Sequence, residues 1–124
     1  MSAKTYAYTD MWGDVLEVRF LRDTYVNGGN LAVQMLAETD EDGETYVEPY
    51  ADLTVNVCGY APAPRCAYID TNNLGNGIIE FLAESGLAEF AGEFAQSGFC
   101  TYPMVRFTDK FFAESAGTVD EVEG

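Results

Sequence analysis

The chain has 124 residues, of which 48% are hydrophobic, and its 21 Asp and Glu residues outnumber six Lys and Arg to give a net charge of −15. This length supports one hydrophobic core but not two independent ones. Histidine is absent, which excludes the commonest general base, the commonest transition-metal ligand and His-activated nucleophiles. The excess of anions also argues against direct binding of nucleic acid, because it repels a phosphate backbone.

The sequence predicts a cytosolic protein. No apolar run approaches the roughly 18 residues needed to cross a bilayer, and the N-terminus lacks the apolar stretch of a signal peptide. The three cysteines, Cys58, Cys66 and Cys100, are sparse and odd in number, which is typical of reduced thiols. Cys58 and Cys66 could face each other across a hairpin, but we expect no disulfide there. We also expect no nucleophilic thiol, since neither His nor enough cations are present to activate one.

The chain from residue 15 to residue 70 reads as strands and turns. Leu16, Val18 and Phe20 alternate with polar residues, which is the pattern of a half-buried strand. An acidic turn is expected at residues 38–44, centred on Asp42 and Gly43, where the charges stay in water. The expected strands are residues 15–21, 31–36, 54–58 and 66–70. Their short connections predict an antiparallel meander.

The pattern changes period after residue 70. Asn72 or Asn73 is expected to cap the principal helix, which continues to Ser85, with Gly86 placed to end it. Further elements are expected as a short helix at residues 87–95 and a final strand at 99–107. The predicted fold is therefore α+β: a curved antiparallel sheet of about four to five strands with one or two helices packed on one face. Residues 1–113 form this single domain, and 114–124 form an acidic, mobile tail.

No sequence motif indicates a cofactor or a metal. There is no CxxC spacing, Walker-type loop or dinucleotide fingerprint. Asp40, Asp42 and Glu44 alternate as in a calcium loop, but the rest of that pattern is missing, so we interpret them as a solvated acidic turn. Asp70 begins a polar cluster at a strand end, which we interpret as a turn with an Asn cap. A carboxylate-based, metal-dependent enzyme that uses Asp70 is the alternative.

Acidic residues are concentrated in two stretches that contain no base, residues 38–52 and 66–105. If both pairs lie on helices, Glu80 and Glu84, like Glu89 and Glu93, bring like charges together and reduce stability. Fifteen negative charges correspond to roughly 25 Å of duplex DNA, about the diameter of a domain of this size. The candidate partner-binding residues are Glu38, Asp40, Glu41, Asp42, Glu44, Asp70, Glu80, Glu84, Glu89 and Glu93.

Most of the aromatic residues are expected in the core. Tyr46, Tyr50 and Tyr60 lie in segments expected to be loops, and they are the candidate aromatic contacts for a partner.

Four segments carry a resemblance to a known family: residues 25–34 (YVNGGNLAVQ), 48–57 (EPYADLTVNV), 68–73 (YIDTNN) and 97–103 (SGFCTYP). Over residues 25–107 the chain resembles a family of small domains of unknown function that are encoded by phages, plasmids and integrative elements of gut bacteria. The resemblance implies a mobile-element setting, and it brings no catalytic residues with it.

The setting and the charge together favour a non-enzymatic binding protein. Small acidic proteins of mobile elements include anti-CRISPR and anti-restriction proteins, which block host defence by occupying DNA-binding surfaces. We therefore expect an inhibitor that mimics DNA and binds a basic, DNA-binding protein or nucleoprotein complex, by analogy of context rather than of site. An accessory protein whose acidity is incidental, as in acidic proteomes, is a further alternative.

Overall fold

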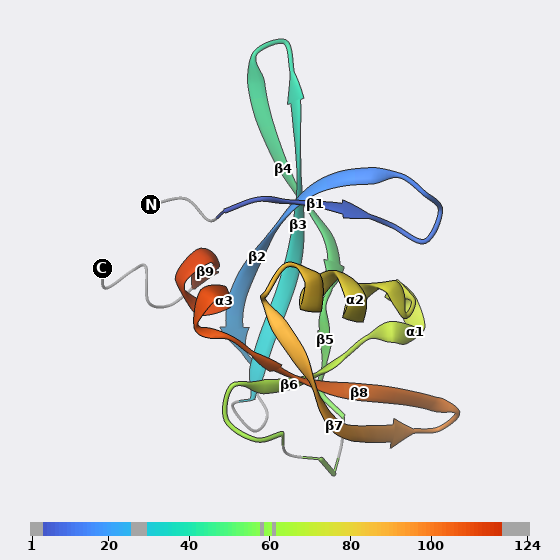
Figure 1. Ribbon diagram of the computed structural model, residues 1–124. Coiled ribbons are helices and arrows are strands. Elements are labelled where there is room, and N and C mark those ends of the chain that lie inside the picture. The colour runs from blue at the N-terminus through green and yellow to red at the C-terminus, as the bar shows by residue number, and fades with distance from the viewer. Residues whose placement is uncertain (1–3, 26–29, 58, 61, 118–124) are drawn as a thin grey trace.

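The computed structural model describes residues 4–25, 30–57, 59, 60 and 62–117. These residues form two β-sheets and three short helices (Figure 1). Sheet A has the order β1-β2-β3-β4, with β9 paired to β2. Its strands are β1 (Tyr6–Thr9), β2 (Val15–Thr24), β3 (Leu31–Glu41), β4 (Glu44–Asp52) and β9 (Ala116–Gly117).

Sheet B continues directly from sheet A. The chain leaves β4, passes the fully buried Leu53 and enters β5, and the order of sheet B is β5-β6-β8-β7. Its strands are β5 (Thr54–Val55), β6 (Cys66–Ile69), β7 (Ala88–Ser97) and β8 (Cys100–Phe107), and the helices are α1 (Thr71–Leu74), α2 (Gly77–Glu84) and α3 (Asp109–Glu114). Among the described residues every strand pair is antiparallel except β2 with β9. The predicted α+β class with antiparallel sheet is confirmed.

The main core lies between the two sheets and the helices. Alternate residues of β2 and β3 point into it, and so do Ile78 and Leu82 of α2 and Phe111 of α3. Phe111 packs its ring 4.2 Å from that of Phe107 in β8 and 5.9 Å from that of Phe20 in β2, so α3 ties the sheets together. A smaller cluster covers the other face of sheet B.

Sheet A is an antiparallel meander, as predicted, but its member strands differ from those expected. The expected strands at 15–21 and 31–36 belong to sheet A, and those at 54–58 and 66–70 belong to sheet B. Strands β1 and β4 and helix α3 were not predicted. The acidic residues expected in a turn lie mostly on strands, because β3 runs to Glu41 and β4 starts at Glu44.

The expected helix at residues 87–95 is instead strand β7. The positive φ of Gly92 (86°) accompanies a register shift between Phe90 and Phe94. This bulge inserts extra residues into the strand. Phe90 and Phe94 are therefore four residues apart, which is the spacing of apolar residues on one face of a helix. Ala88 and Ala95 are buried, whereas Phe90 and Phe94 are about half exposed.

The principal helix within residues 74–85 is confirmed as α2, but its N-terminal part forms a separate helix, α1. Gly75, with a φ of 85°, separates the two. Asp70, rather than Asn72 or Asn73, caps α1. Gly86 ends α2 with a φ of 74°, and the Leu87 N–H donates to the Leu82 carbonyl at 2.9 Å, as a glycine-ended helix requires.

The first residues of the expected tail, 114–117, belong to elements of the fold. Glu114 ends α3, and β9 pairs in parallel with Leu21 and Arg22 of β2. Residues 118–124 lie outside the described residues.

A candidate acidic interface

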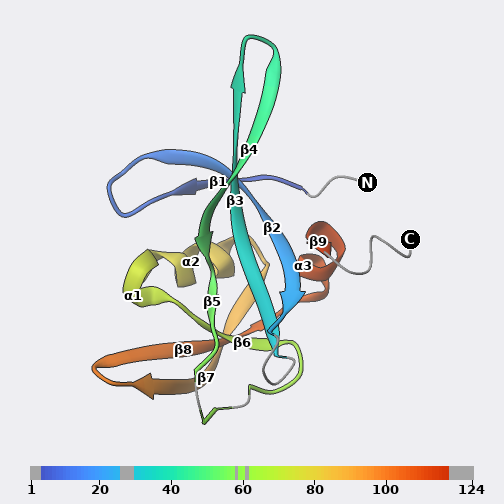
Figure 2. The same ribbon diagram turned by 180° about the vertical axis from the view of Figure 1, so that it is seen from behind.

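One hairpin of sheet A extends beyond the rest of the molecule (Figures 1 and 2). The pairing of β2 with β3 stops at Glu17 and Glu38, whereas β3 and β4 remain paired as far as Glu41 and Glu44. Every residue from 39 to 49 is exposed. We call residues 38–48 the arm. The arm is therefore a two-stranded ribbon with no core beneath most of its length.

A tight turn closes the arm at Asp42 and Gly43. Both residues have positive φ, 53° and 83°, and they are the only residues between the paired Glu41 and Glu44. Two central residues with positive φ define the hairpin turn whose twist matches that of the strands, and Asp-Gly is a favoured sequence for it. The predicted turn at these two residues is confirmed.

The carboxylates of the arm lie on both of its faces. On the face that continues the core side of the sheet, Glu41 stands directly opposite Glu44, and the Tyr46 hydroxyl donates to Glu44 at 2.9 Å. On the other face, the Thr45 hydroxyl donates to Asp40 at 2.7 Å. Directly opposed like charges destabilise a strand pair, so the Glu41–Glu44 pair does not stabilise the arm.

Among the described residues, only one carboxylate of the arm has a cationic partner. Glu38, at the base, lies 3.3 Å from the Nε of Arg19 in β2, and this contact is partly buried. No other described ion pair involves residues of the arm. The negative charge beyond Glu38 is therefore left largely uncompensated.

The remaining predicted acids are not part of the arm. Glu80 and Glu84 are exposed on α2, and Glu89 and Glu93 are exposed on β7, which lies at the opposite end of the molecule from the arm in Figure 1. Glu80 and Glu84 are one helical turn apart, as expected, whereas Glu89 and Glu93 lie on a strand. The structure thus places one group of the predicted acids on the arm and another group on α2 and β7.

Asp70 has a local structural role. It is 7% exposed, and its carboxylate accepts hydrogen bonds from the backbone N–H of Asn73 at 3.3 Å and from the side-chain amide of Asn73 at 2.7 Å. These contacts hold the first turn of α1. A buried carboxylate that caps a helix is poorly placed to contact a partner, so we leave Asp70 out of the candidate interface.

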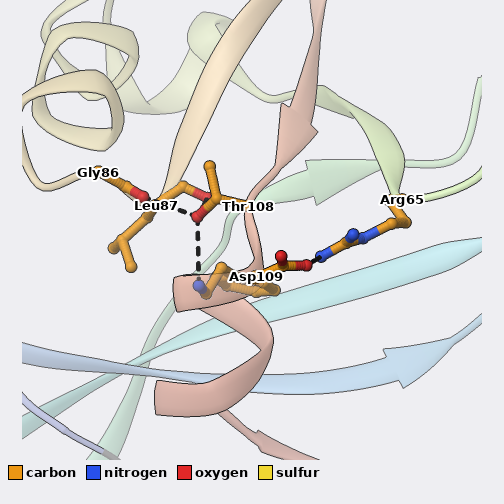
Figure 3. A network of polar contacts seen from close by, with 6 residues as sticks. Arg65, Gly86, Leu87, Thr108 and Asp109 are labelled. Carbon is orange, nitrogen blue, oxygen red and sulfur yellow. Dashed lines mark hydrogen bonds and ion pairs between the residues drawn. The ribbon is translucent and has the colours of Figure 1, made fainter.

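The basic residues are concentrated around α3. The Arg65 guanidinium donates to Asp109 at 2.6 Å (Figure 3). It also lies over the Phe112 ring, 4.7 Å from the ring centroid. Arg22 donates to Ser115 at 2.7 Å. The others are Lys4 beside Glu114, Lys110 within α3, and Arg106, which lines a small pocket with Arg65 and Asp109. Arg19 alone lies elsewhere, at the base of the arm.

Figure 3 also shows how the start of α3 is held. The Thr108 hydroxyl accepts from the Phe111 N–H at 3.3 Å and lies 2.7 Å from the Gly86 carbonyl. Thr108 therefore caps α3 and ties it to the end of α2. These contacts fix the basic side of the molecule to the core.

Sequence reasoning overlooked the acids of the β1–β2 hairpin. Burial raises the pKa of Tyr50, and the charges of Asp10 and Asp14 raise it further, which places both carboxylates near Tyr50 at the base of the arm. Asp10, Gly13 and Asp14 form a turn signal that could have been recognised.

The aromatic candidates are only partly exposed. Tyr46 is exposed on the arm, and Tyr60 is exposed between β5 and β6. Tyr50 instead packs against the core and Tyr8. The most exposed aromatic side chains are instead Trp12 and Phe99.

The described thiols and carboxylates form no cluster of the kind that holds a metal ion. Cys66 is buried, and burial raises the pKa of its thiol; Cys58 lies outside the described residues. Within residues 4–25, 30–57, 59, 60 and 62–117, no group of three or more Cys, Asp or Glu could hold a metal ion. No helix in the same ranges is long and apolar enough to cross a membrane.

A protein-family model described as a domain of unknown function, DUF4313, matches residues 19–122. No curated protein and no solved structure matches the chain. The matched range includes the whole arm, sheet B and α3, and it begins within β2, so that β1 and the β1–β2 turn of sheet A lie outside it.

Proposed function

The chain belongs to the DUF4313 family, and we propose that it is a non-enzymatic binding protein whose acidic arm occupies a nucleic-acid-binding surface of a basic partner. The observation that carries this proposal is the arm itself: a ribbon free of other strands, whose exposed carboxylates beyond Glu38 have no cationic partner in the part of the chain that the structure describes. Such a feature adds little to the core, so its charges are available for recognition.

The charge density of the arm supports mimicry of DNA. From the Ala37–Glu48 pair to the Glu41–Glu44 pair there are four residue steps, which is roughly 14 Å of strand. Apart from Glu38, which pairs with Arg19, this length of the arm, with its turn, carries five acids: Asp40, Glu41, Asp42, Glu44 and Glu48. Duplex DNA carries about eight charges over the same distance. The two densities are therefore of the same order.

The proposed partner is a host defence complex that binds DNA. The resemblance to small acidic domains of mobile elements and the concentration of charge on the arm both favour an anti-CRISPR or anti-restriction role. Such complexes have cationic channels that hold nucleic acid, and an acidic ribbon is narrow enough to enter one. The binding step requires no catalytic group or cofactor.

A displacement assay tests this proposal. A short labelled duplex is bound to a purified CRISPR effector with its guide or to a restriction enzyme, and the protein is titrated in at several salt concentrations. We expect displacement that weakens steeply with salt. Replacing Asp40 and Asp42 by Asn and Glu41 and Glu44 by Gln should weaken it about tenfold or more, since each exposed charge contributes about 0.2–1 kcal/mol.

The matched control removes the same number of charges elsewhere. Replacing Asp23 and Asp52 by Asn and Glu80 and Glu84 by Gln, all of them exposed, leaves the arm intact and gives the same net charge as the arm variant. An equal loss in both variants would show that total charge, and not the arm, is responsible. Failure to displace the duplex from either complex would contradict the proposal.

A further inference from the structure

We propose that the side of the molecule between the β1–β2 and β7–β8 hairpin tips is a second part of the interface, with Trp12 as its aromatic anchor, and that it binds a protein segment whose apolar side chains are flanked by Lys or Arg. This inference rests on the proposed function in taking the partner to be basic. It adds a hydrophobic contact that the acidic arm does not provide.

The β1–β2 tip is an ordered turn. One oxygen of the Asp10 carboxylate accepts from the N–H groups of Trp12 and Asp14, each at 2.9 Å. The Gly13 N–H donates to the Asp10 carbonyl at 3.1 Å, and Gly13 has a φ of 88°. The backbone around Trp12 is therefore fixed before any partner binds, which reduces the entropy that binding costs.

Trp12 is exposed, whereas the half-exposed side chain of the preceding residue, Met11, contacts the body of the molecule. The Met11 side chain approaches Gly75, between α1 and α2, so closely that a Cβ on Gly75 would lie 3.3 Å from the Met11 Cε. Trp12 itself is 76% exposed. Tryptophan is enriched among the residues that dominate protein–protein binding energy. A tryptophan held outward by a fixed turn is consistent with that role.

The second tip presents aromatic residues on the same side of the molecule. Phe99, in the turn between β7 and β8, is fully exposed, and the half-exposed rings of Phe90 and Phe94 lie 5.2 Å apart on β7. In both Figure 1 and Figure 2 the two hairpins project to one side, and α3 lies on the other. The two hairpin tips, which carry Trp12 and Phe99, are thus placed on the side of the molecule away from α3.

Charge selects the occupant of this surface. Asp10 and Asp14 flank Trp12, and Glu93 precedes Phe94 on β7, whereas five of the six basic residues surround α3 and Arg19 pairs with Glu38. A second copy of the chain would bring these carboxylates against one another. A segment with apolar side chains between cations satisfies both the rings and the carboxylates.

Peptide titration tests the inference, because Trp12 is the single tryptophan of the chain and its fluorescence reports on this surface directly. The probes are three synthetic peptides of equal length. The first contains Lys and Leu, the second has the same Lys residues with Gln in place of Leu, and the third has Glu in place of Lys. We expect the Lys/Leu peptide to bind about tenfold or more tightly than the Lys/Gln peptide, with a blue shift of Trp12 emission, and the Glu/Leu peptide not to bind.

Calorimetry with variants completes the test. Trp12→Ser should lose most of the preference for the Lys/Leu peptide, whereas the matched control Tyr46→Ser, an exposed aromatic of the arm, should keep it. Equal affinity for the two Lys peptides would overturn this inference and leave the proposed function standing. No binding of either Lys peptide would count against both. A dimer in sedimentation that Trp12→Ser abolishes would identify a second copy as the occupant and overturn the inference.

Discussion

The body of the molecule and the arm use the same antiparallel pairing for opposite purposes. In the body, β2 and β3 bury Phe20 and Met35 against both sheets and the helices, and these side chains are at most 2% exposed. In the arm, the continuation of β3 buries nothing, and every residue from 39 to 49 is exposed. The difference indicates that stability resides in the body, and that the charges of the arm are free to change with little effect on folding.

The largest expected effect is on the aromatic contact between α3 and the sheets. Phe111→Ala removes a fully buried ring that packs against Phe107 and Phe20, and we expect it to lower the free energy of unfolding by about 3–5 kcal/mol. Urea denaturation measures this change. Tyr46→Ala, in the arm, is the control and should change the value by less than about 0.5 kcal/mol. Similar losses of stability in Phe111→Ala and Tyr46→Ala would contradict the view that stability resides in the body and not in the arm.

The cap of α3 should have a smaller effect. Thr108→Ala removes the acceptor of the Phe111 N–H and the contact with the Gly86 carbonyl, so we expect a loss of about 0.5–2 kcal/mol in the same measurement. Thr108→Ser keeps the hydroxyl and should retain most of the stability. If Ser and Ala are equally unstable, the hydrogen bonds are not responsible.

In the arm, removing a charge should stabilise. Glu41→Gln relieves the repulsion from Glu44 directly opposite while leaving the Tyr46–Glu44 hydrogen bond in place. We expect slower hydrogen exchange of the arm amides, equivalent to about 0.2–1 kcal/mol, with no change in the body. Faster exchange in the arm would mean that Glu41 has a stabilising role that its contacts do not explain.

The smallest expected effect comes from Tyr8, and it changes stability only at alkaline pH. Burial, followed by the charges of Tyr50 and Asp10, raises the pKa of Tyr8, so the folded state holds the phenolic proton more tightly than the unfolded chain does. The stabilisation is complete below a pH of about 10 and is lost as the pH rises further. Tyr8→Phe should make stability fall less steeply in that range, as measured by denaturation at a series of alkaline pH values. Identical slopes would contradict this assignment.

The sequence predicted those features that depend on local chemistry. The turn at Asp42–Gly43 and the helix end at Gly86 follow from the positive φ that these residues accept, and the alternation of Leu16, Val18 and Phe20 marks β2. The assignment of β7 failed, because its bulge at Gly92 separates apolar residues as a helix does.

Tertiary placement was not predictable from spacing. Asp70 and Glu80 look alike in the sequence, but the first is buried as a cap and the second is exposed. The sequence favours a turn over residues 38–44, because Asp and Glu are depleted in strands, whereas the strand pair there is specified by the register of β3 with β4. The exposure of Trp12 depends on the fixed turn around Asp10, which composition does not reveal.

Five of the six basic residues lie around α3, so among the described residues positive charge is separated from the acidic arm. The basic partner that we propose would therefore attract the arm and repel the surroundings of α3, which favours an approach with the arm leading. Salt should then slow association far more than it speeds dissociation, because long-range attraction acts on the encounter and short-range contacts act on the bound state. Orientation is thus selected before the first contact forms.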